Sequence, residues 1–343
     1  MIKVGVSGVG GAVGQGIMKC LSIAKIPVEI CAIDVQSLSG GLFMADERMV
    51  LPKPEGPGGL ESWKKAIIER KVQALIPGSD HDLLPLSSVR DDWADQGVSC
   101  VLVSDPELVK NCRDKACSSA MLDKAGFPAP KAIWDVKVDA AVSWAKDNGF
   151  PVVVKPRDGS ASRHVNLAKD EEELRFYFPR TPNPIVQEWL NKGGESEEFT
   201  CAVFVDKRGV PVADFMARRD LYAGTTYHAE IGFWPEVHDL VMAMGKALRP
   251  RGVLNIQMRS TDRGPVPFEL NIRCSGTSAI RAHFGYNEPE MLLRHYVLGE
   301  DISAPEIRPG FAFRYWNEIF LEGGAPTEGP TEDGRPGAIL AWP

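Results

Sequence analysis

Two lysines stand where a phosphate chain would need positive charge. Residues 152–154 form an apolar run that ends in Lys155, and Lys115 lies at the start of a predicted helix. A buried strand rarely ends in a lysine that has no partner. The small-residue loop over 157–165 offers backbone amides and hydroxyls that can cover phosphates. The group predicts a site for a phosphate-bearing ligand, although each lysine alone is compatible with an ordinary surface position.

A second group of polar side chains suits a hard metal ion. Glu269, Asn271 and Arg273 occupy alternate positions of an apolar run, which puts them on one face of a strand. Gln257 belongs to the preceding run, and a turn at 262–264 brings the two runs side by side. Carboxylate and amide oxygens at this spacing are suitable ligands for hard cations. Taken singly, the same residues also fit a structural ion pair or a solvated strand edge.

A glycine-rich loop, Gly8-Val9-Gly10-Gly11-Ala12-Val13-Gly14, follows the first apolar run and opens a helix. Asp34 ends the second run about twenty residues later, which is the layout of a dinucleotide-binding site. Glycines let backbone amides approach a phosphate at a helix N-terminus. They also serve merely to turn the chain from strand to helix, so the motif is compatible with NAD(P) binding and with a domain that binds none.

Other polar groups have both a functional and a structural interpretation. Asp80 and Asp82 either face a cleft or cap the following helix. Residues 218–220 and 227–228 follow a predicted hairpin, in a segment where arginines can grip a carboxylate but where a solvated loop is the simpler expectation. Among the six histidines, only His164 has a sequence reason for a site role, and their spacing predicts no zinc site.

Composition indicates a metabolic protein of about two domains. The 343 residues are 44% hydrophobic and 25% charged, and 39 Lys and Arg against 46 Asp and Glu give a net charge of −7. Such a charge disfavours nucleic acid and anionic membranes as partners. With no leader pattern and no long apolar run, we expect a cytoplasmic protein. Seven scattered cysteines fit neither a disulfide framework nor a zinc site.

The elements that must position these residues divide the chain into two parts. Over the first 105 residues, β-branched runs alternate with helical stretches, which predicts a parallel sheet covered by helices. Beyond Pro128 and Pro130 the pattern becomes mixed α+β with antiparallel pairs. The predicted strands are 3–6, 28–33, 74–76, 99–103, 152–155, 185–188, 199–205, 210–214, 252–258 and 267–271. The predicted helices are 12–24, 60–70, 114–125, 139–148, 169–178, 237–248 and 288–298, and 322–337 is predicted to be loop.

In this order, the motifs resemble the ATP-grasp superfamily, most of all the synthetase domains of the carbamoyl-phosphate synthase large chain. The resemblance runs from residue 1 to about 300. It implies a Rossmann-like domain over 1–110 that binds no NAD, a two-subdomain ATP-grasp fold over 111–305, and a C-terminal extension over 306–343. Within the ATP-grasp fold, 111–195 would include the lid-like subdomain, and 196–305 would carry the metal and acceptor residues.

The resemblance also implies roles for individual residues. Those that would bind ATP through its phosphates, adenine and ribose are Lys115, Lys155, Gly159, Ser160, Ala161, Ser162, Glu188, Trp189, Leu190 and Glu198. The Mg²⁺ ligands would be Gln257, Glu269 and Asn271, and the catalytic group would be Glu269, Asn271 and Arg273. Substrate would meet Arg218, Ser275, Gly276, Thr277 and Arg281.

The chain departs from the synthase pattern at two positions and in its length. Residues 191–197 lengthen the segment before Glu198, so either Glu197 or Glu198 can face the ribose, and we favour Glu198. Ala161 stands where a glycine is common, which would stiffen the phosphate loop. The second synthetase half is missing, so we do not expect carbamoyl phosphate synthesis.

The sequence and its resemblance together predict an ATP-dependent carboxylate-amine ligase that forms an acyl phosphate and releases ADP and phosphate. Its cofactors would be ATP and Mg²⁺, with Mn²⁺ as a substitute. Its partners would be a small carboxylate and an amine, with a homodimer as one option. Two alternatives remain: a non-catalytic nucleotide-binding regulator with the same fold, and an NAD(P)-dependent oxidoreductase that uses the glycine loop.

Overall fold

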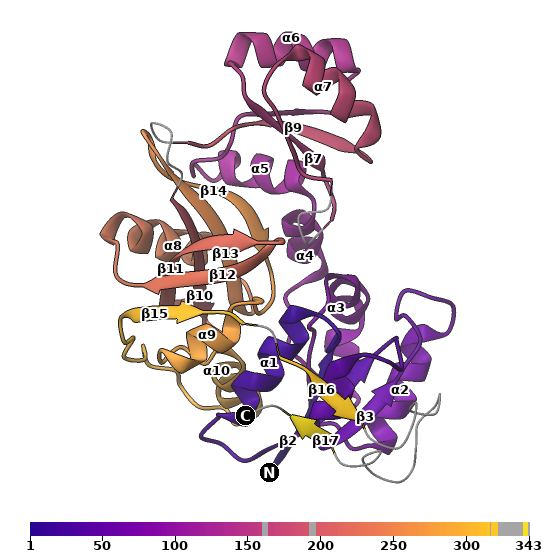
Figure 1. The fold of residues 1–343 in the computed structure, drawn as a ribbon. Helices are drawn as coiled ribbons and strands as arrows, with labels where there is room; N and C mark the ends of the chain where they lie inside the picture. Colours follow the sequence, from indigo (N-terminus) through magenta and orange to yellow (C-terminus); the bar gives the residue numbers. More distant parts are fainter. Residues whose placement is uncertain (160–163, 192–196, 316, 322–338, 342–343) are drawn as a thin grey trace.

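A computed structural model describes the whole chain except residues 160–163, 192–196, 316, 322–338 and 342–343. The N-terminal part is a parallel five-stranded sheet in the order β3-β2-β1-β4-β5 (Figure 1). Its strands are β1 Ile2–Ser7, β2 Val28–Asp34, β3 Glu47–Val50, β4 Ala74–Ile76 and β5 Cys100–Val101. The helices of this part are α1 Ala12–Ser22, η1 Gly40–Met44, α2 Gly59–Glu69, α3 Asp80–Asp95 and α4 Pro106–Arg113. The predicted parallel sheet is confirmed.

A small four-stranded sheet, β6-β9-β7-β8, forms the far end of the molecule (Figure 1). It contains β6 Ala132–Trp134, β7 Val152–Pro156, β8 Asn166–Ala168 and β9 Pro184–Glu188, with α6 Val138–Asn148, α7 Glu171–Tyr177 and η2 Phe178–Arg180. All of its strand pairs are antiparallel. Val152 and Val154 of β7 pack with Ala141 and Leu174 of the two helices in a separate small core. Helix α5, Lys115–Lys124, leads from α4 into this part.

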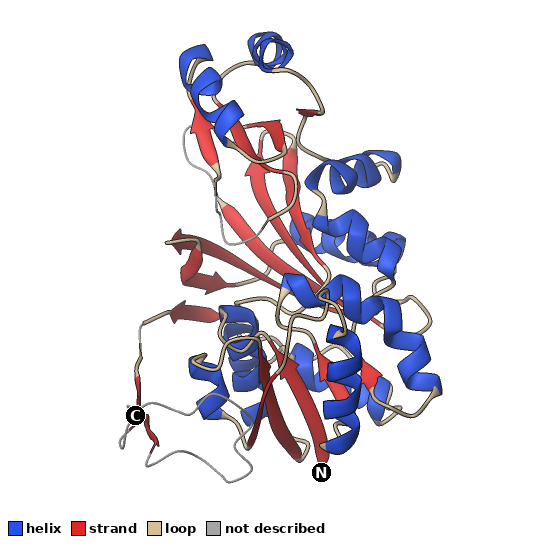
Figure 2. Cartoon of the chain, turned by 90° about the vertical axis from the view of Figure 1, so that its right-hand side faces the viewer, coloured by secondary structure: helices blue, strands red, loops and turns tan. Residues whose placement is uncertain are grey.

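A six-stranded antiparallel sheet, β14-β13-β10-β11-β12-β15, lies between these two parts (Figure 2). Its strands are β10 Glu198–Val205, β11 Pro211–Tyr222, β12 Thr225–Ile231, β13 Gly252–Thr261, β14 Gly264–Asn271 and β15 Gly310–Phe313. All eight residues of β10 are buried, because alternate side chains enter cores on opposite faces. On one face Val203 packs with Val241 of α8, Pro235–Leu248, and on the other Phe204 belongs to the core that includes Leu292.

The C-terminal elements join this sheet to the N-terminal domain. Helix α9, Ser278–His283, and helix α10, Glu288–Leu292, which continues as the π-helical turn η3 over Leu293–Val297, lie beside α1. Asn287 donates from Nδ2 to the carbonyl of Cys20 over 2.9 Å, and Lys25 donates its backbone N–H to Glu290 over 3.1 Å. Two short strands, β16 Ile319–Leu321 and β17 Ile339–Ala341, pair with each other. None of the described helices has the length and apolarity to cross a membrane.

The structure differs from the sequence prediction mainly at the edge of the central sheet. Strand β11 continues to Tyr222, and β12 and β15 follow it, so 218–220 and 227–228 lie in strands and not in a loop. These strands carry polar side chains on their exposed face, which weakened the hydrophobic signal. Helix α3 was considered only as one interpretation of Asp80 and Asp82, because it is polar and contains Pro85; its N-cap is Ser79 and not either aspartate. Most of the loop prediction for 322–337 lies outside the described residues.

Candidate active site

Lys155 and Lys115 come together at one end of a cavity between the two antiparallel sheets. This smaller cavity has a volume of about 270 Å³, and its lining includes Lys115, Lys155, Gly159, Glu188, Trp189, Leu190, Glu198, Gln257, Phe268 and Glu269. Lys115 donates from Nζ to the carbonyl of Gly159 over 3.1 Å, which holds the loop after β7. Lys155 has no such anchor among its described contacts; its Nζ lies 5.6 Å from the centre of the Phe268 ring.

Burial disfavours the charged form of Lys155. Burial is the largest cause that lowers its pKa to about 8, and the neighbouring positive charges of Lys115 and Arg259 lower it further, against Glu269 and Glu198. Its side chain is 6% exposed. A cation that is desolvated next to another cation is stabilised most by an anion in the same cavity. The charge and burial of the two lysines therefore suit the binding of a polyanion.

The residues predicted to hold adenine line the other end of the smaller cavity. Glu188 pairs with Val152 in the sheet, and its Oε1 accepts the backbone N–H of Lys131 at 2.9 Å and a guanidinium N–H of Arg263 at 2.5 Å. Leu190 is buried, and the ring of Trp189 stacks under the guanidinium of Arg259 at 4.3 Å. The wall is thus apolar with fixed polar edges, as a flat heterocycle requires. Ser160, Ala161 and Ser162 lie outside the described residues.

The predicted metal ligands meet on neighbouring strands. The two strands lie side by side, as expected from the turn at 262–264, and a β-bulge between Gln257 and Met258 places Gln257 of β13 opposite Glu269 of β14. Gln257 Nε2 donates to Glu269 Oε1 over 3.3 Å. Asn271 donates from Nδ2 to the same oxygen over 3.0 Å, and Arg273 donates to Asn271 Oδ1 over 3.3 Å. Glu269 and Asn271 therefore share one face of β14, as their alternation predicted. Arg273 was expected on the same strand face, but it lies two residues beyond the end of β14 and reaches the site through its contact with Asn271. A carboxylate and two amides converge here.

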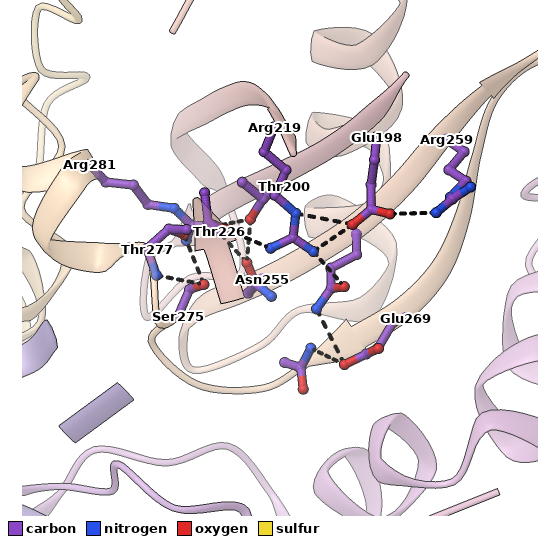
Figure 3. A network of polar contacts seen from close by, with 12 residues as sticks. Glu198, Thr200, Arg219, Thr226, Asn255, Arg259, Glu269, Ser275, Thr277 and Arg281 are labelled. Carbon is purple, nitrogen blue, oxygen red and sulfur yellow. Dashed lines mark hydrogen bonds and ion pairs between the residues drawn. The ribbon is translucent and has the colours of Figure 1, made fainter. Parts of the chain in front are cut away.

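Glu198 is the centre of a buried ionic network (Figure 3). Its Oε1 accepts N–H groups of Arg219 at 2.7 and 3.1 Å, and its Oε2 accepts one from Arg259 at 2.8 Å. Arg219 also donates to Gln257 Oε1 over 2.8 Å, which connects the network to the predicted metal ligands. Glu197 is exposed and pairs with Arg218 at 2.5 Å. Of the two glutamates, Glu198 lines the smaller cavity.

A larger cavity, of about 710 Å³, meets the smaller one at Gln257 and Glu269, which line both. It extends over the carboxyl end of the N-terminal parallel sheet, and its lining includes Gly10, Asp34, Asp80, Arg219, Asn255, Arg273, Ser275, Gly276, Thr277 and Arg314. Asn271 lines a small pocket beside both, of about 60 Å³. A ligand in the smaller cavity and a second ligand in the larger one would thus face each other across Glu269.

Comparison with protein families identifies the central part of the chain. Residues 112–277 match the family described as the ATP-grasp domain. The chain contains an ATP-grasp domain. The smaller cavity and the meeting point of the two cavities belong to this domain, because all the residues named for them above, from Lys115 to Arg273, fall within the matched range.

Relatives of this ATP-grasp chain are distant. It is 33% identical over 106 residues to the C-terminal section of the carbamoyl phosphate synthase large chain of Methanopyrus kandleri, covering 29% of this chain and 19% of that protein. It is 25% identical to D-alanine–D-alanine ligase of Clostridium botulinum, over 57% of this chain and 65% of that enzyme. The chain spans 18% to 65% of the length of the curated relatives compared with it.

Solved structures confirm the ATP-grasp fold over nearly the whole chain. Biotin carboxylase of Campylobacter jejuni superposes with a TM-score of 0.73 at 12% identity, covering 100% of this chain and 84% of that one. N5-carboxyaminoimidazole synthetase of Staphylococcus aureus, solved with ADP bound, gives 0.71 at 14% identity, covering 93% and 82%. The likeness therefore includes the N-terminal parallel domain as well as the two antiparallel sheets.

The predicted substrate residues of the ATP-grasp domain fall into three positions. Ser275, Gly276 and Thr277 line the larger cavity, and Ser275 Oγ lies 2.9 Å from Thr277 Oγ1. Arg281 is fully buried, where it pairs with Glu288 at 3.1 Å and donates to Asn255 Oδ1 over 2.6 Å (Figure 3). Arg218 lies on the exposed side of β11, against Glu197 and Glu230, and is absent from the described linings of both cavities.

In the N-terminal domain, Asp34 is hydrogen-bonded to the glycine loop. In a dinucleotide-binding site, a carboxylate at this place would bind the ribose. Asp34 Oδ2 accepts the backbone N–H of Gly10 at 2.7 Å, and its Oδ1 accepts that of Gln36 at 3.0 Å. A Cβ at Gly14 would lie 2.4 Å from the carbonyl of Gly8, so this glycine is needed for close packing. The carboxylate that NAD would require is already committed to shaping the loop.

Three residues of the site had no assigned role in the sequence prediction, although Asp80 and the segment that contains Arg219 were considered there. Arg219 lines the larger cavity, whereas its neighbour Arg218 does not, because successive strand residues point to opposite faces. Asp80 pairs with Arg273 across the two domains, and the sequence had left its role open. Arg314, in the C-terminal extension, lines the larger cavity. The alternation of β11 could have revealed Arg219, but no local signal marks Arg314.

Proposed function

We propose that this chain is an ATP-dependent carboxylate-amine ligase that works through an acyl phosphate. The observation that carries the proposal is the meeting of the two cavities at Gln257 and Glu269. With adenine against Trp189 and the phosphates at Lys115 and Lys155, the γ-phosphate would reach Glu269. A carboxylate in the larger cavity would then lie on the opposite side, in position for in-line transfer.

The residues at this point suit Mg²⁺. Glu269 supplies a carboxylate, and Gln257 and Asn271 supply amide oxygens if their side chains rotate on binding, so the donor set is made of oxygen. In the part of the chain that the structure describes, no three His, Cys, Asp or Glu side chains form a metal cluster. That composition fits Mg²⁺, which commonly takes few protein ligands and completes its shell with phosphate oxygens and water. The ion would neutralise charge on the γ-phosphoryl group during transfer.

The proposed chemistry balances in two steps. A carboxylate oxygen forms a bond to the γ-phosphorus while the bond from that phosphorus to the β,γ-bridging oxygen breaks, and ADP leaves with the electron pair. The amine nitrogen then attacks the acyl carbon, loses a proton, and expels inorganic phosphate. Arg273, beside Asn271 and Asp80, would stabilise the transferring group, since its guanidinium stays charged at any working pH.

Hydroxylamine tests the proposal without knowledge of the natural amine, because it converts an acyl phosphate into a coloured hydroxamate in the presence of iron. The protein is mixed with Mg·ATP, hydroxylamine and a panel of small carboxylates, and both ADP and hydroxamate are measured. We expect equal amounts of the two with at least one acid, and none of either without acid. Stabilisation by NAD(P) with no effect of Mg·ADP would overturn the nucleotide assignment. Mg·ADP binding without ADP formation from any acid would instead support the non-catalytic alternative.

A further inference from the structure

Arg314, the residue directly after β15, lines the larger cavity. Strand β15 is the edge strand and pairs antiparallel with β12, with His228 opposite Phe313. Arg314 continues this pairing, since its backbone N–H donates to the carbonyl of Tyr227 over 2.7 Å. Its guanidinium donates from Nη2 to the carbonyl of Gly276 over 2.6 Å, at the cavity wall. Both ends of this arginine are therefore held in place.

The charge of Arg314 has no acidic partner among the residues that the structure describes. None of the ion pairs formed by the described residues includes Arg314, whereas nearby Arg219 is paired with Glu198. Burial lowers the pKa of Arg314, and the positive charge of Arg219 lowers it further. A guanidinium does not lose its proton in proteins, so the cost of this half-buried charge is relieved only by an anion or by water.

The carboxylates that line the same cavity are engaged elsewhere. Asp80 pairs with Arg273, Asp34 accepts two backbone N–H groups, and Asp82 Oδ2 accepts the hydroxyl of Ser7 at 2.6 Å. Glu55 lies 4.0 Å from His81, and Glu269 accepts the amides described above. Among the described residues that line the larger cavity, Lys53 and Arg314 are the lysine and the arginine that form no ion pair. Lys53 is exposed to water, whereas Arg314 is half-buried, so an anion in the cavity would stabilise the charge of Arg314 most.

The groups around Arg314 are suited to a carboxylate. Ser275 and Thr277 present hydroxyls 2.9 Å apart next to Gly276, whose carbonyl orients the guanidinium. Thr226 and Asn255 add polar atoms to the same wall. A planar guanidinium with neighbouring hydroxyl donors can bind one carboxylate oxygen while it leaves the other free.

We propose that Arg314, with the hydroxyls of Ser275 and Thr277, binds the carboxylate of the acyl donor. The inference rests on the proposed function and adds the residue that recognises that substrate. The attacking carboxylate and the γ-phosphate are both negative, so a cation on the donor side lowers their repulsion as they approach. Residues 310–314, assigned from the sequence to an extension without a role, thereby become part of the ligase site.

The test measures binding of acetate, succinate and inorganic phosphate to the full chain saturated with Mg·ADP, by calorimetry. The variants are Arg314→Met, which removes the charge, and Arg314→Lys, which keeps the charge but loses the planar guanidinium and its paired N–H donors. The matched control is Arg308→Met, because Arg308 lies in the same segment but is exposed and contacts the carbonyl of His283. Thermal unfolding of each variant shows whether it folds.

We expect a carboxylate to bind the wild type and the Arg308→Met control equally, and at least tenfold more weakly to Arg314→Met, with Arg314→Lys between them. Mg·ADP affinity should stay within about twofold throughout. Any of three results would overturn the inference. Arg314→Met could bind the carboxylate as tightly as the wild type, the wild type could bind no carboxylate, or it could bind phosphate alone. If Arg314→Met does not fold, the Arg314→Lys comparison decides in the same way. Loss of Mg·ADP binding in the wild type would instead refute the proposed function.

Discussion

Arg273 donates from Nε to Oδ1 of Asp80 over 2.6 Å, across 193 positions of sequence. The contact joins the second residue after β14 to the first turn of α3, and so connects the proposed phosphoryl-transfer site to the N-terminal domain. Burial alone would lower the pKa of Arg273, but the adjacent Asp80 carboxylate raises it. Asp80 thus has a positioning role toward an arginine that is 11% exposed.

Asp80→Asn should lower hydroxamate formation by about tenfold or more, because a displaced catalytic group loses its alignment. Nucleotide affinity should change by less than about threefold, since the adenine contacts are remote. The control is Asp105→Asn, whose carboxylate pairs with Arg90 away from both cavities. Steady-state ADP release and calorimetry distinguish the two effects. Equal activity in both variants would show that Arg273 is held by other groups.

Lys155 should make nucleotide binding depend on pH. Its pKa of about 8 in the folded chain lies below the ordinary 10.5, so folding favours the neutral amine, and this group's contribution to stability rises as pH increases from about 8 to 10.5. Bound phosphates favour the charged amine. Affinity for Mg·ADP should therefore fall as pH rises above about 8, by at most roughly tenfold per pH unit.

Calorimetry from pH 7 to 10 tests this dependence, with Lys155→Arg as the variant that stays charged and should show a flat profile. Lys155→Met should bind the nucleotide more weakly at pH 7 by about 1.5–3 kcal/mol, the scale of one lost charge-assisted contact. The same pH slope in Lys155→Arg would assign the dependence to another group.

Glu269→Gln should separate nucleotide binding from chemistry. The variant keeps the side-chain volume but removes the charge at the meeting point of the cavities, so ADP formation should fall by at least about a hundredfold. Nucleotide binding measured without metal should stay within a few-fold. Glu230→Gln, on the exposed face of β12 against Arg218, is the control and should retain activity. Near-normal turnover across a Mg²⁺ series in Glu269→Gln would mean that other residues hold the metal.

Glu198 and Glu197 should differ sharply in their effect on stability. Glu198→Ala leaves Arg219 and Arg259 without their shared carboxylate in a site where Glu198 is 7% exposed, which should cost about 3–5 kcal/mol of unfolding free energy. Glu197→Ala breaks an exposed pair and should cost less than about 1 kcal/mol. Urea unfolding with a constant m-value provides the measurement. Similar losses would show that the network is not buried in solution.

The local sequence pattern was sufficient to predict a strand or helix where one face of that element is clearly apolar. The run 152–155 and the alternation of Glu269 with Asn271 indicated both the strands and the face that these side chains occupy, whereas Arg273 lies beyond the end of its strand. The turn at 262–264 places the two strands side by side, but the register that it sets would put Gln257 opposite Phe268. A β-bulge between Gln257 and Met258 shifts the pairing by one residue and brings Gln257 opposite Glu269, and no local pattern indicates this bulge.

Contacts between distant segments could not be predicted in this way. Asp80 and Arg273 are 193 positions apart, and nothing near either residue indicates the other. Strand β12 shows alternation, but His228 and Glu230 on its exposed face make its sequence resemble a polar loop. Arg314 depends on the pairing of β15 with β12, which closes a segment of about eighty residues. Such pairing is decided by the assembled sheet and not by local propensity.

The larger cavity is lined by residues from Gly8 to Arg314, and this has a consequence for biosynthesis. At about 5–20 residues per second, a ribosome needs roughly a quarter of a minute to a minute to translate from one to the other. The N-terminal sheet, whose strands all precede residue 102, is available for folding early in that interval. The nascent polypeptide lacks the last wall of the cavity until β15 has left the ribosome. Substrate capture by this wall is therefore a property of the nearly finished chain, late in its translation.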